Sequence, residues 1–515
     1  MAKIILLAMF QFVMISFMCA SASASAAISW CSQTPNPEPC EYFLTQNPKY
    51  DISSIHEKPD FLKMSLQIAL DRSIHVLSGL QQLGPKCCSA RERAAWADCV
   101  KFYEKTSHEL NKTVDTTADM QRRLTVALTN LETCKDGFAD FGIQDYFTVF
   151  PILSNNVSLL LSNTLALSST SDDSMSISPV SDGEGFPEWV PSADLELLQS
   201  STPGADVVVA QDGSGDFTTV GEAVAAAANR SGSGRYVMYV KAGTYKENVE
   251  IGEKLVNVML LGDGIGRTII TGSRSNSTGY TTFNSPTVAV EGAGFIGRGI
   301  TFQNTAGPEN GQAVALRSDS EHSVFYQCSF EGYQDTLYVH ARNQFYRNCD
   351  IYGTVDFIFG NAAVVLQNCN IYLHYHKSNT ITAQSRTEAT QKTGIIIHNS
   401  RVTAAPDLQP VQGSVKSYLG RPWKKYSRTV FMKTELDSLI DPAGWLPWDG
   451  TVGLDTLYYA EYANTGPGSS TANRVNWTNY HVITSPSVAA QFTPGNFIDA
   501  NSWLPATNVP FTPGL

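Results

Sequence analysis

The sequence has no surplus of positive charge. Its 515 residues include 36 Lys and Arg against 48 Asp and Glu, which gives a formal net charge of −12. Proteins that bind nucleic acid draw much of their affinity from Lys and Arg that neutralise phosphates, so this composition argues against that class. The 38 Gly and 24 Pro follow no regular period, which excludes a collagen-like fold and simple disorder.

Beyond the N-terminus, no stretch reaches the roughly 18 consecutive apolar residues that a membrane-spanning helix needs. The N-terminus itself carries Lys3, an apolar run over residues 4–18 and small residues over 22–26. This order is typical of a secretory signal, so we predict that residues 1–27 are removed and that the protein is secreted, with no membrane partner. The N-glycosylation sequons, which also fit export, begin at Asn111, Asn156, Asn229, Asn276 and Asn476.

Residues 60–167 carry apolar side chains at helical spacing. Besides the stripe of a first helix, similar stripes run through 89–112, 116–133 and 144–167. Four such helices predict a four-helix bundle. The stripe of the first helix comprises Leu62, Leu66, Ala69, Leu70, Ile74, Leu77 and Leu80.

Two cysteine pairs accompany these helices. Cys31 and Cys40 lie nine residues apart in a Pro-rich segment ahead of the bundle, a spacing that suits a local disulfide. A bond between Cys99 and Cys134 would join two of the helices.

The Cys31/Cys40 pair and the segments ALDRSI, ADCVKFYEKTSHEL and VALTNLETCKDGF resemble the plant invertase and pectin methylesterase inhibitor family over residues 28–167. The resemblance implies two disulfides, Cys31–Cys40 and Cys99–Cys134. Cys87 and Cys88 lie outside the family pattern and stay unassigned. Residues 168–204, rich in Ser, Asp and Gly, predict a flexible linker after this domain.

Short β-branched runs replace the helical stripes from residue 206 onward. Cys328, Cys349 and Cys369 recur at steps of 21 and 20 residues, each within a similar local sequence. A period near 20 with short strands predicts coils stacked about 4.8 Å apart, and we interpret this half as a parallel β-helix, with a two-sheet sandwich as the alternative. Because Cys328 and Cys349 would lie in line on adjacent coils, we expect a disulfide between them and a free Cys369.

Two acidic residues keep the register of this repeat. Asp335 and Asp356 each follow a repeat cysteine by seven residues, with Gln334 beside the first and Gln312 one coil earlier. Two carboxylates about 5 Å apart repel by roughly 3 kcal/mol at an effective dielectric constant near 20. That is enough to leave one protonated and the other ionised, so the pair could divide acid and base work. Stacked Asp and Asn also occur in solenoids for structural reasons, and spacing alone does not decide between the two interpretations.

Five motifs stand in order through this half of the chain: GTYKE (243–247), GQAVAL (311–316), GYQDTLY (332–338), DFIFG (356–360) and YLGRPW (418–423). Together they resemble the plant pectin methylesterases. The resemblance implies a right-handed parallel β-helix over residues 205–515 that hydrolyses the methyl esters of cell-wall homogalacturonan, without a metal or other cofactor. The whole chain then resembles an enzyme precursor with an inhibitor-like N-terminal domain, and a separate inhibitor of that family is an expected partner.

The resemblance also assigns roles to residues. Asp356 would be the nucleophile, and Asp335 would protonate the leaving methanol and then activate water. Gln312 and Gln334 would stabilise the oxyanion, a role that suits neutral amide donors because they leave the nucleophile charged. Arg421 would pair with Asp356 and keep it ionised.

Substrate contacts follow from the same resemblance and from the aromatic residues near the last motif. The expected contacts are Thr282, Gln312, Arg421, Trp423 and Trp445. Aromatic faces suit sugar stacking, whereas for Trp448 we favour a place in the core.

Related enzymes carry a basic pair before Leu-Leu where the precursor is cut, but here Leu195-Glu196 stands at that place.

Several competing motifs lack their structural context. GAGFIG (292–297) precedes a strand-like segment rather than a helix, so it predicts no dinucleotide site. His374 and His376 have no nearby set of acids or cysteines that would predict a metal site. The sequence contains no G-x-S-x-G motif, so it does not predict the nucleophile elbow of a serine esterase. The remaining alternatives are a pectin-depolymerising β-helix enzyme and a secreted inhibitor or wall-binding protein with an inert β-helix.

Overall fold

The computed structural model describes residues 28–46, 49–50, 55–84, 89–116, 119–168, 204–230 and 232–515. The chain divides into two compact units, Met1–Ser174 and Met175–Leu515. The expected signal segment, most of the expected linker, and Cys87 and Cys88 lie outside the described residues. Within the described part of the chain, no helix combines the length and apolar character needed to cross a membrane.

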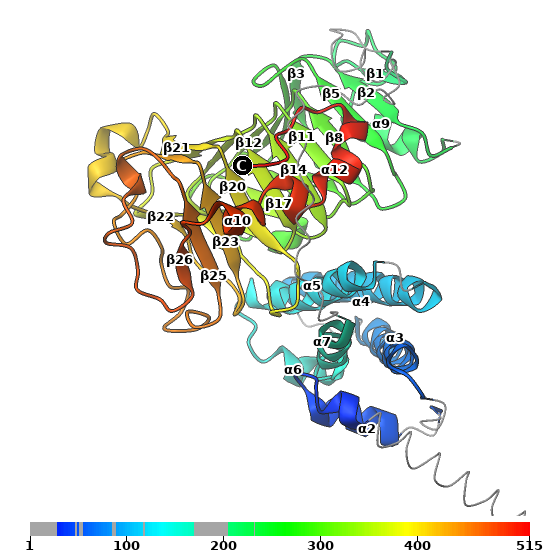
Figure 1. Ribbon diagram of the computed structural model, residues 1–515. Coiled ribbons are helices and arrows are strands. Elements are labelled where there is room, and N and C mark those ends of the chain that lie inside the picture. Colours follow the sequence, from blue (N-terminus) through cyan, green and yellow to red (C-terminus); the bar gives the residue numbers. More distant parts are fainter. Residues whose placement is uncertain are drawn as a thin grey trace, which may run out of the picture. The chain divides into compact units, whose positions relative to one another are not determined.

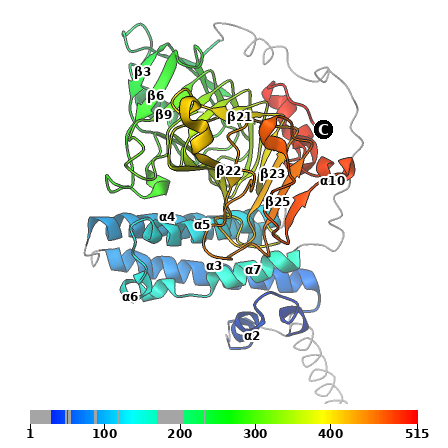
Figure 2. The ribbon, with the colours of Figure 1, turned by 90° about the vertical axis from the view of Figure 1, so that its left-hand side faces the viewer.

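In the described part of the first unit, the longer helices form a bundle (Figure 2). α3 contacts α4 and α7, and α5 contacts the same two helices, so the four close around one core. The helices are α2 (Pro37–Thr45), α3 (Lys58–Leu83), α4 (Ala90–Asp115), α5 (Met120–Ala139), α6 (Tyr146–Val149) and α7 (Val157–Ser168). α4 begins at a capping box in which Ser89 and Glu92 each accept a hydrogen bond from the other's backbone N–H.

Two expectations for the helices are wrong. The stripe over 144–167 is broken into α6, the 3-10 turn η3 (Pro151–Leu153) and α7, because Pro151 has no N–H to continue a helix. Ile74 is 49% exposed although its neighbours Leu70 and Val76 are buried. The apolar face of α3 therefore turns away from Ile74, and the burial of Ile68 and Val76 shows where that face lies.

Both expected disulfides of the first unit are present. Cys31 is bonded to Cys40, and Cys99 on α4 is bonded to Cys134 on α5. All four cysteines are buried, so each bridge joins two segments within the core rather than at its rim.

The second unit is a parallel β-helix, as the repeat predicted. Every pairing between its strands is parallel, from the first pair, β1 with β2, to the last, β25 with β26. The 11-stranded sheet comprises β1 (Val207–Val209), β2 (Tyr236–Val240), β5 (Val258–Gly262), β8 (Ile296–Arg298), β11 (Ser323–Tyr326), β14 (Asn343–Arg347), β17 (Ala363–Gln367), β20 (Gly394–His398), β23 (Arg428–Met432), β25 (Tyr458–Tyr462) and β26 (Tyr480–Val482). Figure 1 shows these strands succeeding one another along one side of the unit.

Two further sheets complete the coils. The 7-stranded sheet comprises β4 (Val249–Ile251), β7 (Val288–Val290), β10 (Leu316–Ser318), β13 (Leu337–Val339), β16 (Val355–Gly360), β19 (Ser378–Gln384) and β22 (Lys416–Gly420). The 8-stranded sheet comprises β3 (Gly243–Lys246), β6 (Thr268–Gly272), β9 (Thr301–Asn304), β12 (Ser329–Glu331), β15 (Asp350–Gly353), β18 (Asn370–Leu373), β21 (Arg401–Ala404) and β24 (Glu435–Leu436).

Short helices accompany the sheets. α9 (Val220–Ala227) lies near the first coils. α10 (Pro486–Ala490), α11 (Pro494–Phe497) and α12 (Ala500–Trp503) follow the last strand, and their apolar residues pack on the outer face of the 11-stranded sheet (Figure 1). Single 3-10 turns occur at η4 (Thr282–Asn284), η5 (Gln409–Ser414), η6 (Pro467–Ser469) and η7 (Leu504–Thr507).

The core lies inside the coils, where side chains in register stack on one another. Phe325 stacks on Tyr346 with ring centroids 4.7 Å apart, and Phe302 stacks on Phe330 at 5.6 Å. Successive residues of a strand point inward and outward in turn. A repeat near 20 residues therefore places the same type of side chain at the same depth on each coil.

The expected disulfide between Cys328 and Cys349 is wrong: both cysteines are free and buried, and so is Cys369. Each immediately precedes one of three paired residues, Ser329, Asp350 and Asn370. Side chains at equivalent positions of parallel strands point the same way, whereas a disulfide needs a specific convergent geometry. The result is a column of stacked thiols, and burial, with contacts to the two neighbouring thiols, raises the pKa of Cys349 well above its ordinary value.

Candidate active site

Asp335 and Asp356 occupy equivalent places on adjacent coils. Each lies two residues before a paired core residue, since Leu337 of β13 pairs with Ile358 of β16. Both have a left-handed backbone, with φ of 62° and 51°, a conformation that Asp tolerates better than most residues. Their side chains are largely buried, at 8% and 4% exposure. The register that the repeat predicted for this pair is confirmed.

A β-bulge re-aims the second of these acids. Val355 pairs with Thr380, but Ile358 pairs with Thr382, so β16 has one more residue than β19 between the two pairings. Such a bulge bends the strand and changes the direction of the side chains within it. Asp356 lies inside the bulge.

Asp356 is held by two residues from the next two strands of the 7-stranded sheet. Arg421 donates from Nε to Oδ1 at 2.9 Å and from Nη2 to Oδ2 at 2.6 Å. Thr380 donates from its hydroxyl to Oδ1 at 2.6 Å, and the same hydroxyl accepts the backbone N–H of Asp356 at 3.0 Å. Both carboxylate oxygens are thereby oriented by a cation and a hydroxyl, and no sequence motif pointed to Thr380.

Arg421 follows β22 directly and is fixed there by its own backbone. Its N–H donates to the carbonyl of Thr382 at 3.0 Å. Burial alone would lower the pKa of Arg421, but the hydrogen bonds and charge of Asp356, together with the charge of Asp335, raise it above its ordinary value. The guanidinium also lies over the ring of Trp448, 4.3 Å from its centroid. It therefore remains a cation between the two acids and an aromatic ring.

The two glutamines belong to the turns that precede β10 and β13. The backbone N–H of Ala313, next to Gln312, donates to the carbonyl of Gln334 at 3.2 Å, and that of Asp335 donates to Val355 at 3.1 Å. Gln312 and Gln334 are both partly exposed. These bonds bring the segments of both glutamines and both acids together on three adjacent coils, as the spacing predicted.

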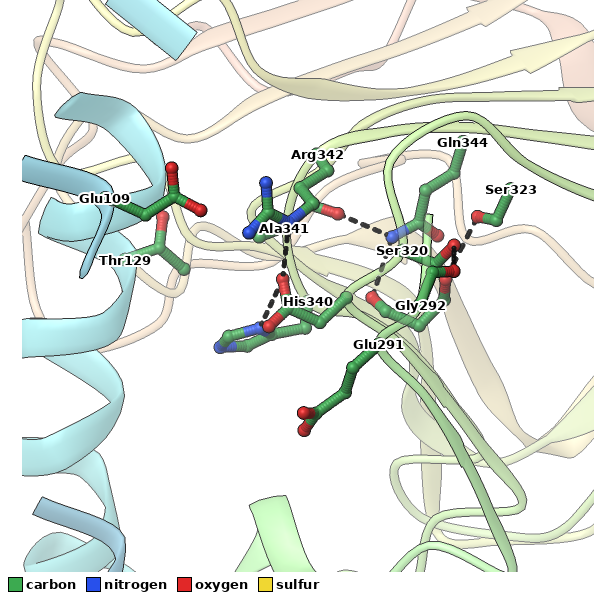
Figure 3. A network of polar contacts seen from close by, with 12 residues as sticks. Glu109, Thr129, Glu291, Gly292, Ser320, Ser323, His340, Ala341, Arg342 and Gln344 are labelled. Atoms are coloured by element: carbon green, nitrogen blue, oxygen red, sulfur yellow. Dashed lines mark hydrogen bonds and ion pairs between the residues drawn. The ribbon is translucent and has the colours of Figure 1, made fainter. Parts of the chain in front are cut away.

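A second buried cluster of polar residues lies at the other end of the same strands (Figure 3). Asp319 follows β10, and its carboxylate lies 3.7 Å from Nδ1 of His340 and 3.4 Å from Nε of Arg342. Ser320 donates to the carbonyl of Gly292 at 2.6 Å. The histidine is packed edge-on against the rings of Phe283 and Tyr338 and has no exposed surface, and Asp319 is also buried. Neither residue can contact a polymer, and we interpret this cluster as structural.

Comparison with known proteins agrees with this arrangement. Family models described as Pectinesterase and as Plant invertase/pectin methylesterase inhibitor match residues 206–501 and 25–167. Pectinesterase 2 of Citrus sinensis is 62% identical over 494 residues, which cover 95% of this chain and 94% of that protein. The chain belongs to the pectinesterase family.

Further relatives support the same membership. Probable pectinesterase/pectinesterase inhibitor 17 of Arabidopsis thaliana is 59% identical, with 95% of this chain and 94% of that protein covered. The solved pectin methylesterase from carrot is 58% identical, and the match covers 61% of this chain and 100% of that one with a TM-score of 0.60. As a pectinesterase, the chain is a carboxylic ester hydrolase, and an inhibitor-type domain precedes its β-helix.

The outer face of the 7-stranded sheet adds aromatic residues that the sequence reasoning did not single out. Tyr338 and Phe359 occupy paired positions on adjacent coils, and their rings stack with centroids 4.2 Å apart. Phe359 lies 6.0 Å from Trp423, which lies 6.2 Å from Trp448. A chain of rings therefore runs from Tyr338 past the Asp356–Arg421 pair.

The expectation that Trp445 contacts the substrate is contradicted, because its side chain is only 1% exposed. Trp445 is bridged to Gly420, which is aligned with the inward-facing Thr382. Its ring therefore enters the core and stacks near Tyr459, with centroids 4.3 Å apart. The expected core place of Trp448 is also wrong, since that ring is partly exposed and covers Arg421.

Thr282 lies in the 3-10 turn η4 and is mostly buried. The adjacent Phe283 packs against the guanidinium of Arg317, 3.5 Å from the ring centroid. Arg317 in turn is aligned with Tyr338. Thr282 therefore lies on the coils that precede the acid pair, and its contact with substrate stays a prediction.

Proposed function

We propose that this pectinesterase hydrolyses methyl esters of homogalacturonan in the cell wall through a covalent intermediate on Asp356. The arrangement that carries the proposal is the aligned pair of acids, in which Arg421 donates to both carboxylate oxygens of Asp356. A carboxylate that is held by Arg421 and Thr380 keeps its charge and a fixed direction, as a nucleophile needs.

In the first half-reaction, a carboxylate oxygen of Asp356 attacks the ester carbonyl carbon. The carbonyl π electrons move to oxygen, and side-chain N–H groups of Gln312 and Gln334 donate to this oxyanion. The intermediate then collapses and expels the methoxy group, which takes a proton from the carboxyl group of Asp335 and leaves as methanol. Asp356 and the galacturonate now share an anhydride.

In the second half-reaction, Asp335 is a carboxylate and accepts a proton from water. The hydroxide oxygen adds to the galacturonyl carbonyl, with the same two glutamines stabilising the oxyanion. Collapse breaks the bond to Asp356, which regains its negative charge, and releases the galacturonate with a free carboxyl group. The sum is one ester and one water converted into one acid and one methanol.

The pectin chain is proposed to lie along the aromatic outer face of the 7-stranded sheet. Sugar rings present apolar C–H faces that pack on aromatic rings. Trp423 and Trp448 are partly exposed and lie 6.2 Å apart near Arg421, so these two rings can offer such a face, whereas Tyr338 and Phe359 are buried. Trp423 and Thr282 are the proposed contacts that the family resemblance assigned.

The test is methanol release from methyl-esterified pectin by the chain after it has been cut between residues 168 and 204, with the polymer length followed at the same time. The proposal predicts methanol without shortening of the chain. Chain shortening would instead support a depolymerising enzyme, and no change in either quantity would support an inert β-helix that only binds the wall.

We also propose that the inhibitor-type domain restrains the β-helix until the connecting segment is cut. The support is that residues 25–167 match a family of inhibitors of this same activity and are tethered to their target. A tether of roughly 35 residues keeps two domains at an effective concentration commonly in the millimolar range, so even weak binding would be occupied. A separate inhibitor protein of the same family is then an expected partner of the released β-helix.

A protease site inserted between residues 168 and 204 of the full chain tests the restraint. Methanol release is measured before and after cleavage at equal concentration, with the uncut sequence under protease as the control. Restraint predicts a rise in specific activity after cleavage, and unchanged activity would leave the domain a role in folding or export only.

A further inference from the structure

The segment 421–428 joins β22 to β23 and carries Arg421 and Trp423. Its first residue is fixed by the backbone bond to Thr382. Its other end is fixed at Tyr426, whose backbone N–H donates to the carbonyl of Arg386 at 3.0 Å. The position of Arg421 beside Asp356 thus depends on anchors at both ends of a short connection.

Arg386 holds Tyr426 in both directions. Besides accepting from the Tyr426 N–H, Arg386 donates from Nε to the carbonyl of the same residue at 2.6 Å. Its Nη1 donates to the carbonyl of Gln391 at 3.3 Å. Arg386 is 4% exposed, so water does not compete for the donors and acceptors of these hydrogen bonds.

A buried network links this contact to the strand that carries Asp356. The backbone N–H groups of Arg386 and Arg428 both donate to Oε1 of Gln384, at 3.0 and 2.7 Å. Gln384 in turn donates from Nε2 to Oδ1 of Asn361 at 3.1 Å, and Asn361 directly follows β16. The network therefore joins the strand of the nucleophile to the far end of the segment that begins with Arg421.

Burial of the Arg386 guanidinium at this position costs free energy of folding. Among the described residues it has no carboxylate within ion-pair distance, and burial together with the charge of Arg428 lowers its pKa to about 8. A buried cation without a counter-ion costs stability unless its hydrogen bonds are well made. Its only side-chain partners within that part of the chain are the carbonyls of Tyr426 and Gln391, so its contribution lies in where those carbonyls are held.

We propose that Arg386 is a positioning residue for the esterase reaction, which holds the segment 421–428 so that Arg421 meets Asp356. The inference rests on the proposed role of Arg421. A displacement of about 1 Å in a catalytic group commonly costs around 100-fold in rate. Loss of the Arg386 side chain should therefore lower kcat by about 10- to 100-fold while the β-helix stays folded.

The experiment uses the full chain, and it combines turnover with hydrogen exchange. Arg386→Met is compared with Arg347→Met, a control in which a half-buried arginine loses its bond to Gln367 on the 11-stranded sheet. Arg386→Met should speed exchange in peptides from 421–428 and lower kcat, and Arg347→Met should do neither. Faster exchange with unchanged kcat would overturn the proposal.

A double-mutant cycle asks whether Arg386 acts through Arg421. The Arg386→Met/Arg421→Lys double variant should be no more than about twofold slower than Arg421→Lys alone, whereas independent, multiplying losses would refute the positioning role. If Arg421→Lys is slow and Arg386→Met is not, only the role of Arg386 fails. If Arg421→Lys keeps full turnover, the proposed role of Arg421 fails and the positioning role falls with it. Should Arg386→Met not fold, Arg386→Lys replaces it, because lysine keeps the charge but cannot reach both carbonyls in the arginine geometry.

Discussion

Arg421 donates to both carboxylate oxygens of Asp356 although 65 positions separate the two residues in the chain. The ion pair spans the strand between them, since β16, β19 and β22 are neighbours in the 7-stranded sheet. Thr380 on the intervening strand completes the shell around Asp356. Three consecutive coils therefore supply the nucleophile, its hydroxyl partner and its cation.

Thr380→Val should lower kcat by about tenfold while the protein stays folded. The substitution keeps the shape but removes the hydroxyl that fixes Oδ1 of Asp356, and a hydrogen bond to a charged group contributes roughly 1.5–3 kcal/mol. Thr382→Val is the matched control, because its hydroxyl on the same strand donates to the Leu419 carbonyl instead. Steady-state methanol release measures both variants, and equal kcat values would show that the Thr380 hydroxyl does not orient the nucleophile.

Alanine substitutions of Trp448 and Trp445 should have different effects, the first on activity and the second on stability. Trp448→Ala removes the ring over Arg421 and is expected to lower kcat/KM by about tenfold with little change in unfolding free energy. Trp445→Ala empties a core position and should cost about 3–5 kcal/mol of stability. Pectin kinetics and urea unfolding of both variants provide the comparison. The reverse pattern would restore the interpretation that Trp445 contacts the sugar chain.

His398 should make the β-helix sensitive to acid. It is buried on β20, where Nδ1 lies 3.0 Å from Nε2 of Gln367. Burial, with the charges of Lys433 and Arg347, lowers its pKa from 6.5 to about 4. The unfolded chain therefore binds a proton below pH 6.5 that the folded chain does not bind until pH 4, and folding loses roughly 3 kcal/mol across that window.

His398→Gln removes this titration. Urea unfolding at pH 7 and pH 4 should show a smaller loss of stability on acidification in the variant than in the parent chain. An identical loss in both would mean that His398 does not contribute to acid sensitivity.

The repeat and the acid pair could be predicted from sequence because both depend on register alone. Once Cys328, Cys349 and Cys369 define the coil, parallel strands must place Asp335 beside Asp356, and the strand pairings confirm this alignment. The helices α3, α4 and α5 were predictable because each has an apolar face at helical spacing, whereas Pro151 interrupts the fourth stripe.

Contacts that depend on side-chain direction could not be read in this way. The bulge in β16 decides that Asp356 meets Thr380 and Arg421, and no sequence motif marks a bulge there. The sequence pattern did not predict that Trp445, bridged to Gly420, enters the core, or that the ring of Trp448 lies at Arg421. The free thiols of Cys328 and Cys349 show the same limit, since alignment on adjacent coils does not supply disulfide geometry.

The most direct test of the proposed mechanism is the turnover of Asp356→Asn, measured as methanol release from methyl-esterified pectin after variant and parent chains have been cut between residues 168 and 204. Asp350→Asn is the control, because Asp350 lies on β15 of the neighbouring sheet and accepts a hydrogen bond from Asn370. With circular dichroism showing a folded β-helix in both variants, the mechanism predicts a loss of at least about 10³-fold for Asp356→Asn and near-normal turnover for Asp350→Asn. Turnover by folded Asp356→Asn within tenfold of the parent chain would contradict the assignment of Asp356 as the nucleophile.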